Sequence, residues 1–301
     1  MKTRSVVILI VVLVLLGGAF LFGAAAAFLS HLSGGSNRGL WSSGNEIGVV
    51  TVEGGIYNDK DILENIDDFR RDDAIKAIIL RIDSPGGSVA TSQEIYQALV
   101  KAREVKPVIA SMATLGASGG YYVALGASKI LANPGTVTGS IGVRLDHVML
   151  KDLFTWAKIQ HETLKSGKFK DIGTFDRPLT DEERALLQNL MDDIHAQFKE
   201  TVARERKLDP AEVDRIADGR VYTGREAFEL KLIDALGGFT DAVALAKELS
   251  GITGEPELVE HKKSNYEWLG AFVESTMRMA AEALVGAIET RSARMPEYRT
   301  R

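Results

Sequence analysis

The sequence predicts an α/β fold in which parallel strands alternate with helices, and three observations point to it. Short apolar runs rich in β-branched residues alternate with longer segments whose apolar residues recur at helical spacing. The connections between them are short, as in right-handed strand–helix–strand units. Two glycine-rich loops, at residues 86–87 and 116–120, directly follow predicted strands. Because the ligand-binding loops of such folds lie at the C-terminal ends of the strands, the two loops together indicate a site.

The predicted elements follow one another along the chain. The predicted strands are short and apolar, and they cover residues 47–52, 77–82, 107–112 and 129–132. The predicted helices have apolar residues three or four apart or an acidic first turn, and they cover residues 61–71, 89–104, a short stretch ending at 125, 180–206, a short stretch starting at 208, and 240–249. In isolation, Gly86-Gly87 would be a plain turn. Its position at the same sheet edge as the loop at 116–120 is what favours a site.

The N-terminal segment predicts a membrane anchor. Residues 6–29 carry no charge and are almost all apolar. As a helix this stretch would be about 36 Å long, enough to cross a hydrocarbon core of roughly 30 Å. Lys2 and Arg4 precede it and the next charge is Arg38, so the positive-inside rule puts the N-terminus in the cytoplasm. The alternative is a signal peptide cleaved after residues 24–26, whose apolar region is usually only about 7–15 residues long. Either way, the bulk of the chain is expected to be exported.

Composition excludes several classes of function. The net charge of the chain is −5, whereas nucleic-acid-binding domains are usually basic, so we expect no nucleic-acid partner. The chain has no cysteine, which removes disulfides, thiolate nucleophiles and cysteine metal sites. Its five histidines are scattered and show no metal-ligand spacing. We therefore expect neither a metal nor a cofactor.

A single hydroxyl lies among glycines just after the strand predicted at 107–112, in Gly116-Ala-Ser-Gly-Gly120. The flanking glycines permit a tight turn and the close approach of a substrate backbone. Ser118 is therefore a candidate nucleophile that needs a base. The G-x-S-x-G pattern matches the α/β-hydrolase elbow, which needs a downstream histidine, but His195 lies in a long helix and His261 in a polar tail. A structural alternative is that Ser118 only caps a helix.

Lysine is the alternative base, since a neutral amine can accept the serine proton. A lysine pKa near 10.4 must fall by about 3 units to leave free amine at neutral pH, which costs roughly 4 kcal/mol. Burial in an apolar groove supplies such a shift and suits an enzyme whose substrates are apolar peptides. Composition and spacing leave four lysines open, namely Lys129, Lys165, Lys168 and Lys170.

Five separated motifs occur in order behind the predicted anchor. They are Asp83-Ser-Pro-Gly-Gly87, Gly116-Ala-Ser-Gly-Gly-Tyr-Tyr122, Thr138-Gly-Ser-Ile-Gly-Val143, Ser166-Gly-Lys-Phe-Lys-Asp171 and Gly219-Arg-Val-Tyr-Thr-Gly224. On these motifs the chain resembles the signal peptide peptidase A family, in its short, single-domain bacterial form, over roughly residues 46–250. The resemblance implies a Clp-protease/crotonase-like fold preceded by a single N-terminal transmembrane helix, and a serine peptidase with a Ser-Lys dyad.

The resemblance also implies a role for each matching residue. Ser118 resembles the family's nucleophile and Lys170 its general base. Ser140 matches the hydroxyl that hydrogen-bonds the lysine amine. The backbone N–H groups of Gly87 and Gly119 match the oxyanion hole, in which each donor contributes about 3 kcal/mol in the transition state.

Two other lysines bear on this match. Lys168 lies two residues from Lys170 and would share its face on a strand, so a shift in register would select Lys168 instead. Lys231 stands where the family usually has a glycine, which affects a helix C-terminus but no catalytic role.

Residues and resemblance together predict a single-pass protein of the cell membrane, with a cytoplasmic N-terminus and an extracytoplasmic catalytic domain that degrades residual signal peptides or other apolar peptides. The expected parts are a membrane anchor at 1–30, a linker at 31–45, the Ser-Lys peptidase domain at 46–251, and a C-terminal amphipathic helix and tail at 252–301. Family members form homo-oligomeric rings, in some of which the serine and the lysine come from different subunits. Two alternatives are a non-catalytic membrane scaffold and an acyl-CoA enzyme on the same kind of fold. An exported location argues against the second, because coenzyme A is cytoplasmic.

Overall fold

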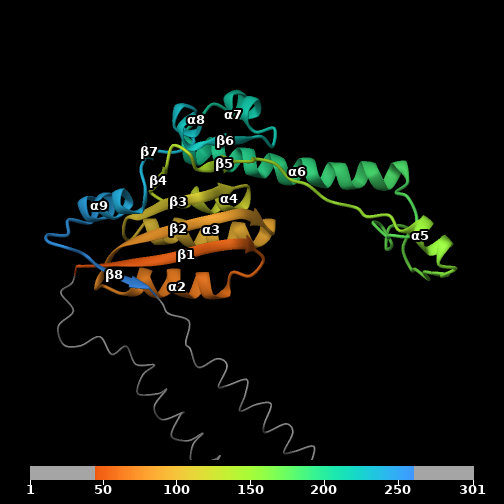
Figure 1. The fold of residues 1–301 in the computed structure, drawn as a ribbon, viewed down its shortest axis with the longest axis horizontal. Helices are drawn as coiled ribbons and strands as arrows, with labels where there is room; N and C mark the ends of the chain where they lie inside the picture. Colours follow the sequence, from red (N-terminus) through yellow and green to blue (C-terminus); the bar gives the residue numbers. More distant parts are fainter. Residues whose placement is uncertain (1–44, 261–301) are drawn as a thin grey trace, which may run out of the picture. The chain divides into compact units, whose positions relative to one another are not determined.

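A mostly parallel β-sheet organises residues 45–260, the part of the chain that the computed structural model describes (Figure 1). Its strands are β1 (Glu46–Ile56), β2 (Ile75–Gly87), β3 (Val108–Ala117), β4 (Lys129–Ala132), β5 (Val137–Gly139), β6 (Val221–Thr223), β7 (Ala235–Leu236) and β8 (Glu257–Glu260). They run in the order β6-β5-β3-β2-β1-β8, with β4 paired to β3 and β7 paired to β4. Every pairing is parallel except that of β5 with β6. The predicted α/β class is confirmed.

Helices cover both faces of this sheet (Figure 1). They are α2 (Lys60–Arg71), α3 (Val89–Arg103), α4 (Gly119–Ala124), α5 (Lys151–Trp156), α6 (Asp181–Arg206), α7 (Pro210–Ile216), α8 (Gly224–Glu229) and α9 (Phe239–Ser250). Side chains alternate along a strand, so Ile78 and Leu80 of β2 join the core under α2, α3 and α4, whereas Ala77 and Ile79 join a second core under α9. The fold therefore has three layers, with the sheet in the middle.

The strand that positions the candidate site is β3, because it changes its partner halfway along. From Ile109 to Met112 it pairs with β4, and from Leu115 to Ala117 it pairs with β5. The neighbouring β2 bends at the same level, with a register shift between Ile82 and Ser84. The ends of β2 and β3, which carry the two glycine-rich loops, consequently stay side by side.

A segment between β5 and α6 extends away from the sheet, and we call residues 145–180 the arm (Figure 1). The arm contains α5 and is held together locally. The Leu150 N–H donates to the Phe175 carbonyl at 2.6 Å, and the rings of Phe154 and Phe175 meet edge to face with centroids 5.3 Å apart. The α6 helix then starts at a full capping box on Thr180, as its acidic first turn predicts.

The observed elements differ from the predicted ones mainly at their ends. The strands β2 and β3 continue to Gly87 and Ala117, so each glycine-rich loop is the end of a strand. Beyond the expected domain boundary at residue 251, Ile252 is buried in the core under α9 and β8 pairs with β1. The chain therefore continues to contribute to the core and to the sheet after residue 251. The predicted anchor at 6–29 and the amphipathic part of the C-terminal segment lie outside the described residues. Within residues 45–260, no helix combines the length and apolar character needed to cross a membrane.

Lys231, the position at which the resemblance leads us to expect a glycine, lies just after α8. Lys231 has a φ of 60°, in the left-handed region where a Cβ costs about 1–2 kcal/mol. Its N–H donates to the Phe228 carbonyl at 3.0 Å, which closes the last turn of the helix. This positive φ explains why a glycine suits the position. Lys231 lines neither of the cavities at Ser118 that are described below.

Candidate active site

Ser118 lies where β3 passes into α4, in a strained backbone conformation. Its φ is 52° and its ψ is −120°, a region that residues other than glycine rarely adopt. Neighbouring backbone holds it there, because the Ser118 N–H donates to the Gly139 carbonyl at 2.8 Å and the Ser118 carbonyl accepts the Tyr122 N–H at 2.9 Å. Ser118 occupies the N-cap position of α4, yet its side chain makes no capping hydrogen bond. A capping role therefore does not account for this serine.

The loop at the end of β2 brings backbone N–H groups close to Ser118. The buried Ser84 hydroxyl holds this loop, since it donates to a carbonyl of β1 at 2.6 Å and accepts the Gly86 N–H at 3.1 Å. Gly86 has a φ of 96°, and a Cβ there would lie 2.5 Å from the Gly119 nitrogen, so this approach requires glycine. A Cβ on Gly119 would in turn lie 3.1 Å from the Gly87 nitrogen. The backbones of Gly87 and Gly119 are thus neighbours beside Ser118, and such closeness is one condition for a two-donor oxyanion hole.

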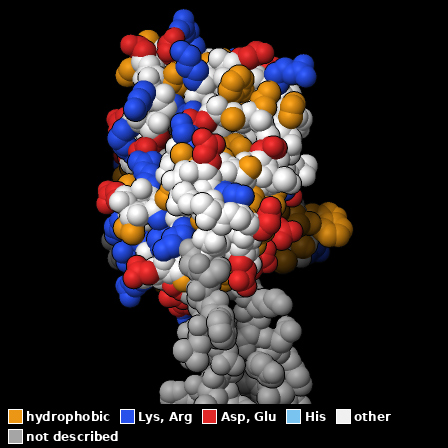
Figure 2. Space-filling view, turned by 90° about the vertical axis from the view of Figure 1, so that its left-hand side faces the viewer, with side chains coloured by type: hydrophobic (Ala, Val, Ile, Leu, Met, Phe, Trp, Pro, Cys, Tyr) orange, Lys and Arg blue, Asp and Glu red, His pale blue; other side chains and the backbone are white. Residues whose placement is uncertain are grey.

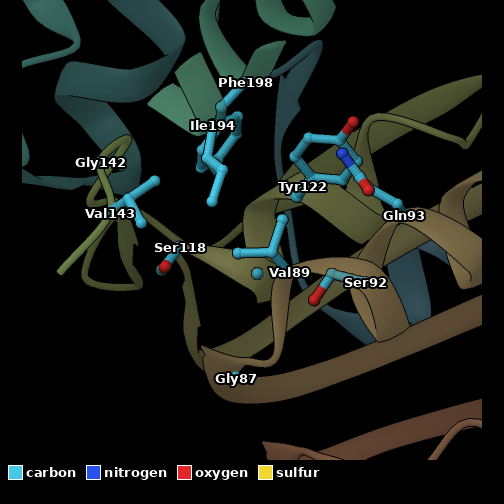
Figure 3. A pocket seen from close by; sticks show the side chains of 11 residues that line it. Gly87, Val89, Ser92, Gln93, Ser118, Tyr122, Gly142, Val143, Ile194 and Phe198 are labelled. Atoms are coloured by element: carbon cyan, nitrogen blue, oxygen red, sulfur yellow. The ribbon is translucent and has the colours of Figure 1, made fainter. Parts of the chain in front are cut away.

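Two cavities meet at Ser118. A polar cleft of about 830 Å³ is lined by Gly87, Ser118 and Ser140, among others. A much smaller apolar pocket of about 30 Å³ opens beside Ser118 and also contacts Gly119. In Figure 3 the Ser118 side chain lies between the Gly142–Val143 segment and Val89, among the residues that line the small pocket. The structure thus brings four of the five predicted site residues together.

The wall of the small pocket was not predicted from the sequence. It is formed by side chains from α3, α4 and α6, namely Val89, Tyr122, Ile194 and Phe198 (Figure 3). The Tyr122 ring packs against Phe198, with centroids 4.9 Å apart, and its hydroxyl lies 3.2 Å from Thr201 Oγ1. Ile194 and Phe198 are four residues apart and share one helix face. This spacing could have predicted that Ile194 and Phe198 form one buried face of α6. It could not have predicted that this face borders the pocket beside Ser118.

Hydrogen bonds of Ser140 and of the next residue, Ile141, hold the Ser140 backbone in place. Its φ is also positive, at 50°, and its N–H donates to the Arg220 carbonyl at 2.8 Å. The carbonyl of buried Ile141 accepts the Gly219 N–H at 3.1 Å and lies 3.2 Å from His195 Nε2. Because only a protonated nitrogen can bond a carbonyl, Nε2 carries hydrogen here. His195 also lines the cleft, and its hydrogen bond to the Ile141 carbonyl helps to hold the Ser140 segment.

The other histidines of residues 45–260 lie in the arm, where each has a local partner. His147 Nε2 is 2.8 Å from the Thr174 carbonyl oxygen, and His161 Nδ1 is 2.9 Å from Asp176 Oδ2. Over the same residues, no group of three or more histidine, aspartate or glutamate side chains is placed to hold a metal ion. Within residues 45–260, none of these histidines makes a hydrogen bond with Ser118.

Lys170 lies in the arm and lines neither cavity at Ser118. The other three candidate lysines are engaged in ion pairs, Lys129 with Asp234 at 3.5 Å, Lys165 with Asp171 at 2.6 Å, and Lys168 with Glu182. Within residues 45–260, the ammonium group of Lys170 has no such partner. Of the four candidates, Lys170 is therefore the one without an ion-pair partner among the described residues.

Comparison with known proteins gives the family. The family model described as Peptidase family S49 matches residues 101–253, just over half of the chain. A Synechocystis sp. protein, provisionally named a protease, is 47% identical over 184 residues, which cover 61% of this chain and 66% of that protein. A Methanocaldococcus jannaschii protein with the same provisional description is 33% identical over 276 residues, 87% of each chain. An Enterococcus faecium protein, provisionally named signal peptide peptidase SppA, is 32% identical over 219 residues, which cover 71% of this chain and 63% of that protein. This chain therefore belongs to peptidase family S49, the family of serine peptidases that includes the signal peptide peptidases.

Proposed function

We propose that this chain is a membrane-anchored serine endopeptidase with a Clp-protease/crotonase-like fold, which degrades residual signal peptides and other apolar peptides through a Ser118–Lys170 dyad. The observation that carries the proposal is the strained Ser118 at the cleft, with a side chain not used for capping and with the backbones of Gly87 and Gly119 beside it. The location rests on the sequence pattern of residues 6–29, which favours a cytoplasmic N-terminus and an extracytoplasmic catalytic domain.

In the proposed reaction, the Ser118 hydroxyl oxygen attacks the carbonyl carbon of a peptide bond while the neutral Lys170 amine takes the hydroxyl proton. The carbonyl oxygen becomes an oxyanion, which accepts hydrogen bonds from the N–H groups of Gly87 and Gly119. The peptide C–N bond then breaks as the lysine ammonium gives its proton to the departing amine, and the acyl group remains on Ser118 as an ester. A water molecule, deprotonated by the same lysine, hydrolyses that ester. The Ser140 hydroxyl orients the lysine amine.

The position of Lys170 supports a dyad formed between two copies of the chain. The arm that carries it exposes large apolar side chains, and those of Trp156 and Leu164 are 81% and 91% exposed. Further exposed apolar residues of the arm are Leu145, Val148, Met149, Leu153 and Ile159. Such a set is typical of a surface that another protein covers. We therefore propose a homo-oligomeric ring in which the arm of one copy brings its Lys170 to the partner subunit's Ser118.

The small pocket supports the proposed substrate class. Its walls are mainly apolar and its volume is only about 30 Å³, so it favours a short apolar side chain over a long one. A peptide held with its carbonyl at Ser118 would place a neighbouring side chain there. The proposed cleavage therefore follows a small residue, such as alanine, within an apolar segment.

The test uses the full-length chain in detergent micelles with an apolar peptide that contains one alanine. Cleavage after the alanine, and labelling of Ser118 by a fluorophosphonate probe located by mass spectrometry, are the expected results. The matched substrate replaces that alanine with aspartate and should be cut at least about 10-fold more slowly, because the pocket would have to desolvate a charge. Failure of both cleavage and labelling would favour the non-catalytic scaffold, and coenzyme A binding would revive the acyl-CoA alternative.

The oxyanion-hole assignment predicts the effect of Gly87→Ala. A Cβ on Gly87 would lie 2.2 Å from the Ile56 carbonyl oxygen, so the loop must move and carry the Gly87 N–H with it. We expect kcat to fall by about 100-fold or more, and the free energy of unfolding to fall by about 1–3 kcal/mol. Peptide hydrolysis and urea unfolding measure the two effects.

Gly135→Ala is the matched control for this prediction. A Cβ on Gly135 would meet nothing within 4 Å, so both kcat and stability should stay at their wild-type values. A Gly87→Ala enzyme with wild-type kcat would remove Gly87 from the oxyanion hole.

A further inference from the structure

The segment that carries Lys170 is a run of turns, and we call residues 165–177 the lysine loop. The Lys170 N–H donates to the Gly167 carbonyl at 3.1 Å, and the Thr174 N–H donates to the Asp171 carbonyl at 3.1 Å. No α-helix or strand runs through these residues. Turns of this kind fix the backbone only locally, so other contacts must set the direction in which the lysine loop presents Lys170.

Asp171, the residue after Lys170, joins the two ends of the lysine loop. Its carboxylate lies 2.6 Å from the Lys165 ammonium and 3.1 Å from the Arg177 guanidinium. Only 11% of the Asp171 side chain is exposed, which is unusual for a carboxylate unless it is paired. The hydrogen bond from Lys165, together with the charge and hydrogen bond of Arg177, lowers the pKa of Asp171. The Asp171 carboxylate is therefore ionised at neutral pH.

Arg177 continues this connection to α6. Its guanidinium binds both carboxylate oxygens of Glu183, at 2.6 Å and 2.8 Å, in the forked geometry that makes such pairs strong. Glu183 lies in the first turn of α6, closes the capping box with Thr180, and is only 4% exposed. The hydrogen bond from Arg177 is the main reason that the pKa of Glu183 falls to about 2. One arginine thus ties the carboxylate next to Lys170 to the start of a 26-residue helix.

We infer that Arg177 is the positioning residue of the general base, because it holds the lysine loop on α6 in one orientation. The inference rests on the proposed function, in which Lys170 takes the Ser118 proton. The Lys170 ammonium has no hydrogen bond or ion pair with another residue of 45–260, so within its own chain the backbone of the lysine loop is what limits its position. Since displacing a catalytic group by about 1 Å can cost 10²-fold in rate, the anchoring of that backbone governs the rate of acylation.

The test compares Arg177→Gln and Arg177→Lys with Arg184→Gln in the full-length chain. Glutamine removes the charge and the fork, whereas lysine keeps the charge but cannot bridge two carboxylates in the same way. Arg184 is an exposed arginine in the first turns of the same helix, so it controls for a lost positive charge. We expect Arg177→Gln to lower kcat by about 100-fold with KM changed by less than about 3-fold. Arg177→Lys should recover part of this loss, and Arg184→Gln should match the wild type.

The double variant Lys170→Ala/Arg177→Gln separates positioning from a general structural role. If Arg177 acts through Lys170, the double variant keeps the residual activity of Lys170→Ala alone. A further loss in the double variant, or a wild-type kcat in Arg177→Gln, would overturn the inference while leaving the proposed function intact. Full activity in Lys170→Ala alone would remove the proposed base, and the inference with it.

A second variant covers the case in which Arg177→Gln does not fold, as judged by thermal unfolding. Asp171→Asn keeps the shape of the side chain but removes the charge that both Lys165 and Arg177 contact. It should lower kcat in the same direction, again without effect in the Lys170→Ala background. A wild-type kcat in Asp171→Asn would overturn the inference.

Discussion

Replacing Ser118 with alanine should lower kcat by about 10⁴-fold or more, because no side-chain oxygen then remains to form the acyl-enzyme ester. The Ser118 side chain makes no capping hydrogen bond, so the free energy of unfolding should change by less than about 1 kcal/mol. Hydrolysis of the apolar peptide in micelles gives kcat. The Kd of an uncleavable analogue, measured by titration, should stay close to the wild-type value, since the cleft keeps its shape.

Ser88→Ala is the matched control for Ser118→Ala. Ser88 lines the same cleft, is exposed, and makes no capping hydrogen bond at the start of α3. Its removal should leave kcat within about twofold of the wild type. Activity in Ser118→Ala together with an inactive Ser88→Ala would move the nucleophile to Ser88. Activity in both variants would exclude these two serines as the nucleophile.

The order of strands and helices could be predicted because local patterns encode it. Ile78, Leu80 and Ile82 alternate with residues of the opposite face, and the acidic first turn of α6 marks its start. The change of partner along β3 could not be predicted in this way, because strand pairing depends on packing between distant segments. The same holds for β8 (Glu257–Glu260), which is too short and too charged to be identified as a strand before its pairing with β1 is known.

The glycines of the candidate site were easier to predict than its other residues. Gly86 and Gly119 are required because backbones approach closely there, and such a requirement shows in the sequence as a glycine. Phe198 looks like an ordinary core residue of a helix, and its place at the pocket follows only from how α6 crosses α4. The choice between Lys168 and Lys170 needed the family resemblance. In the structure, Lys168 forms an ion pair with Glu182, which lies 14 residues away in the sequence.

Lys170→Ala should lower kcat by about 10³-fold, which is the contribution of a well-placed general base. Lys168→Ala is the matched control, because its pair with Glu182 joins two exposed side chains and such pairs contribute only about 0–1 kcal/mol. It should keep kcat within about threefold. If Lys168→Ala were inactive and Lys170→Ala active, Lys168 would be the general base instead of Lys170.

Mixing two inactive variants then determines whether the dyad is shared between copies. Ser118→Ala and Lys170→Ala chains carrying different affinity tags are expressed together, and complexes that contain both are purified. If the arm of one copy completes the cleft of the next, random order around a ring gives an intact serine and an intact lysine at about a quarter of the sites, so about a quarter of the wild-type activity should return. A dyad within each chain gives no intact site in any mixture. Such a result would require the arm to fold back onto its own cleft, and the exposed side chains of Trp156 and Leu164 would then need another partner.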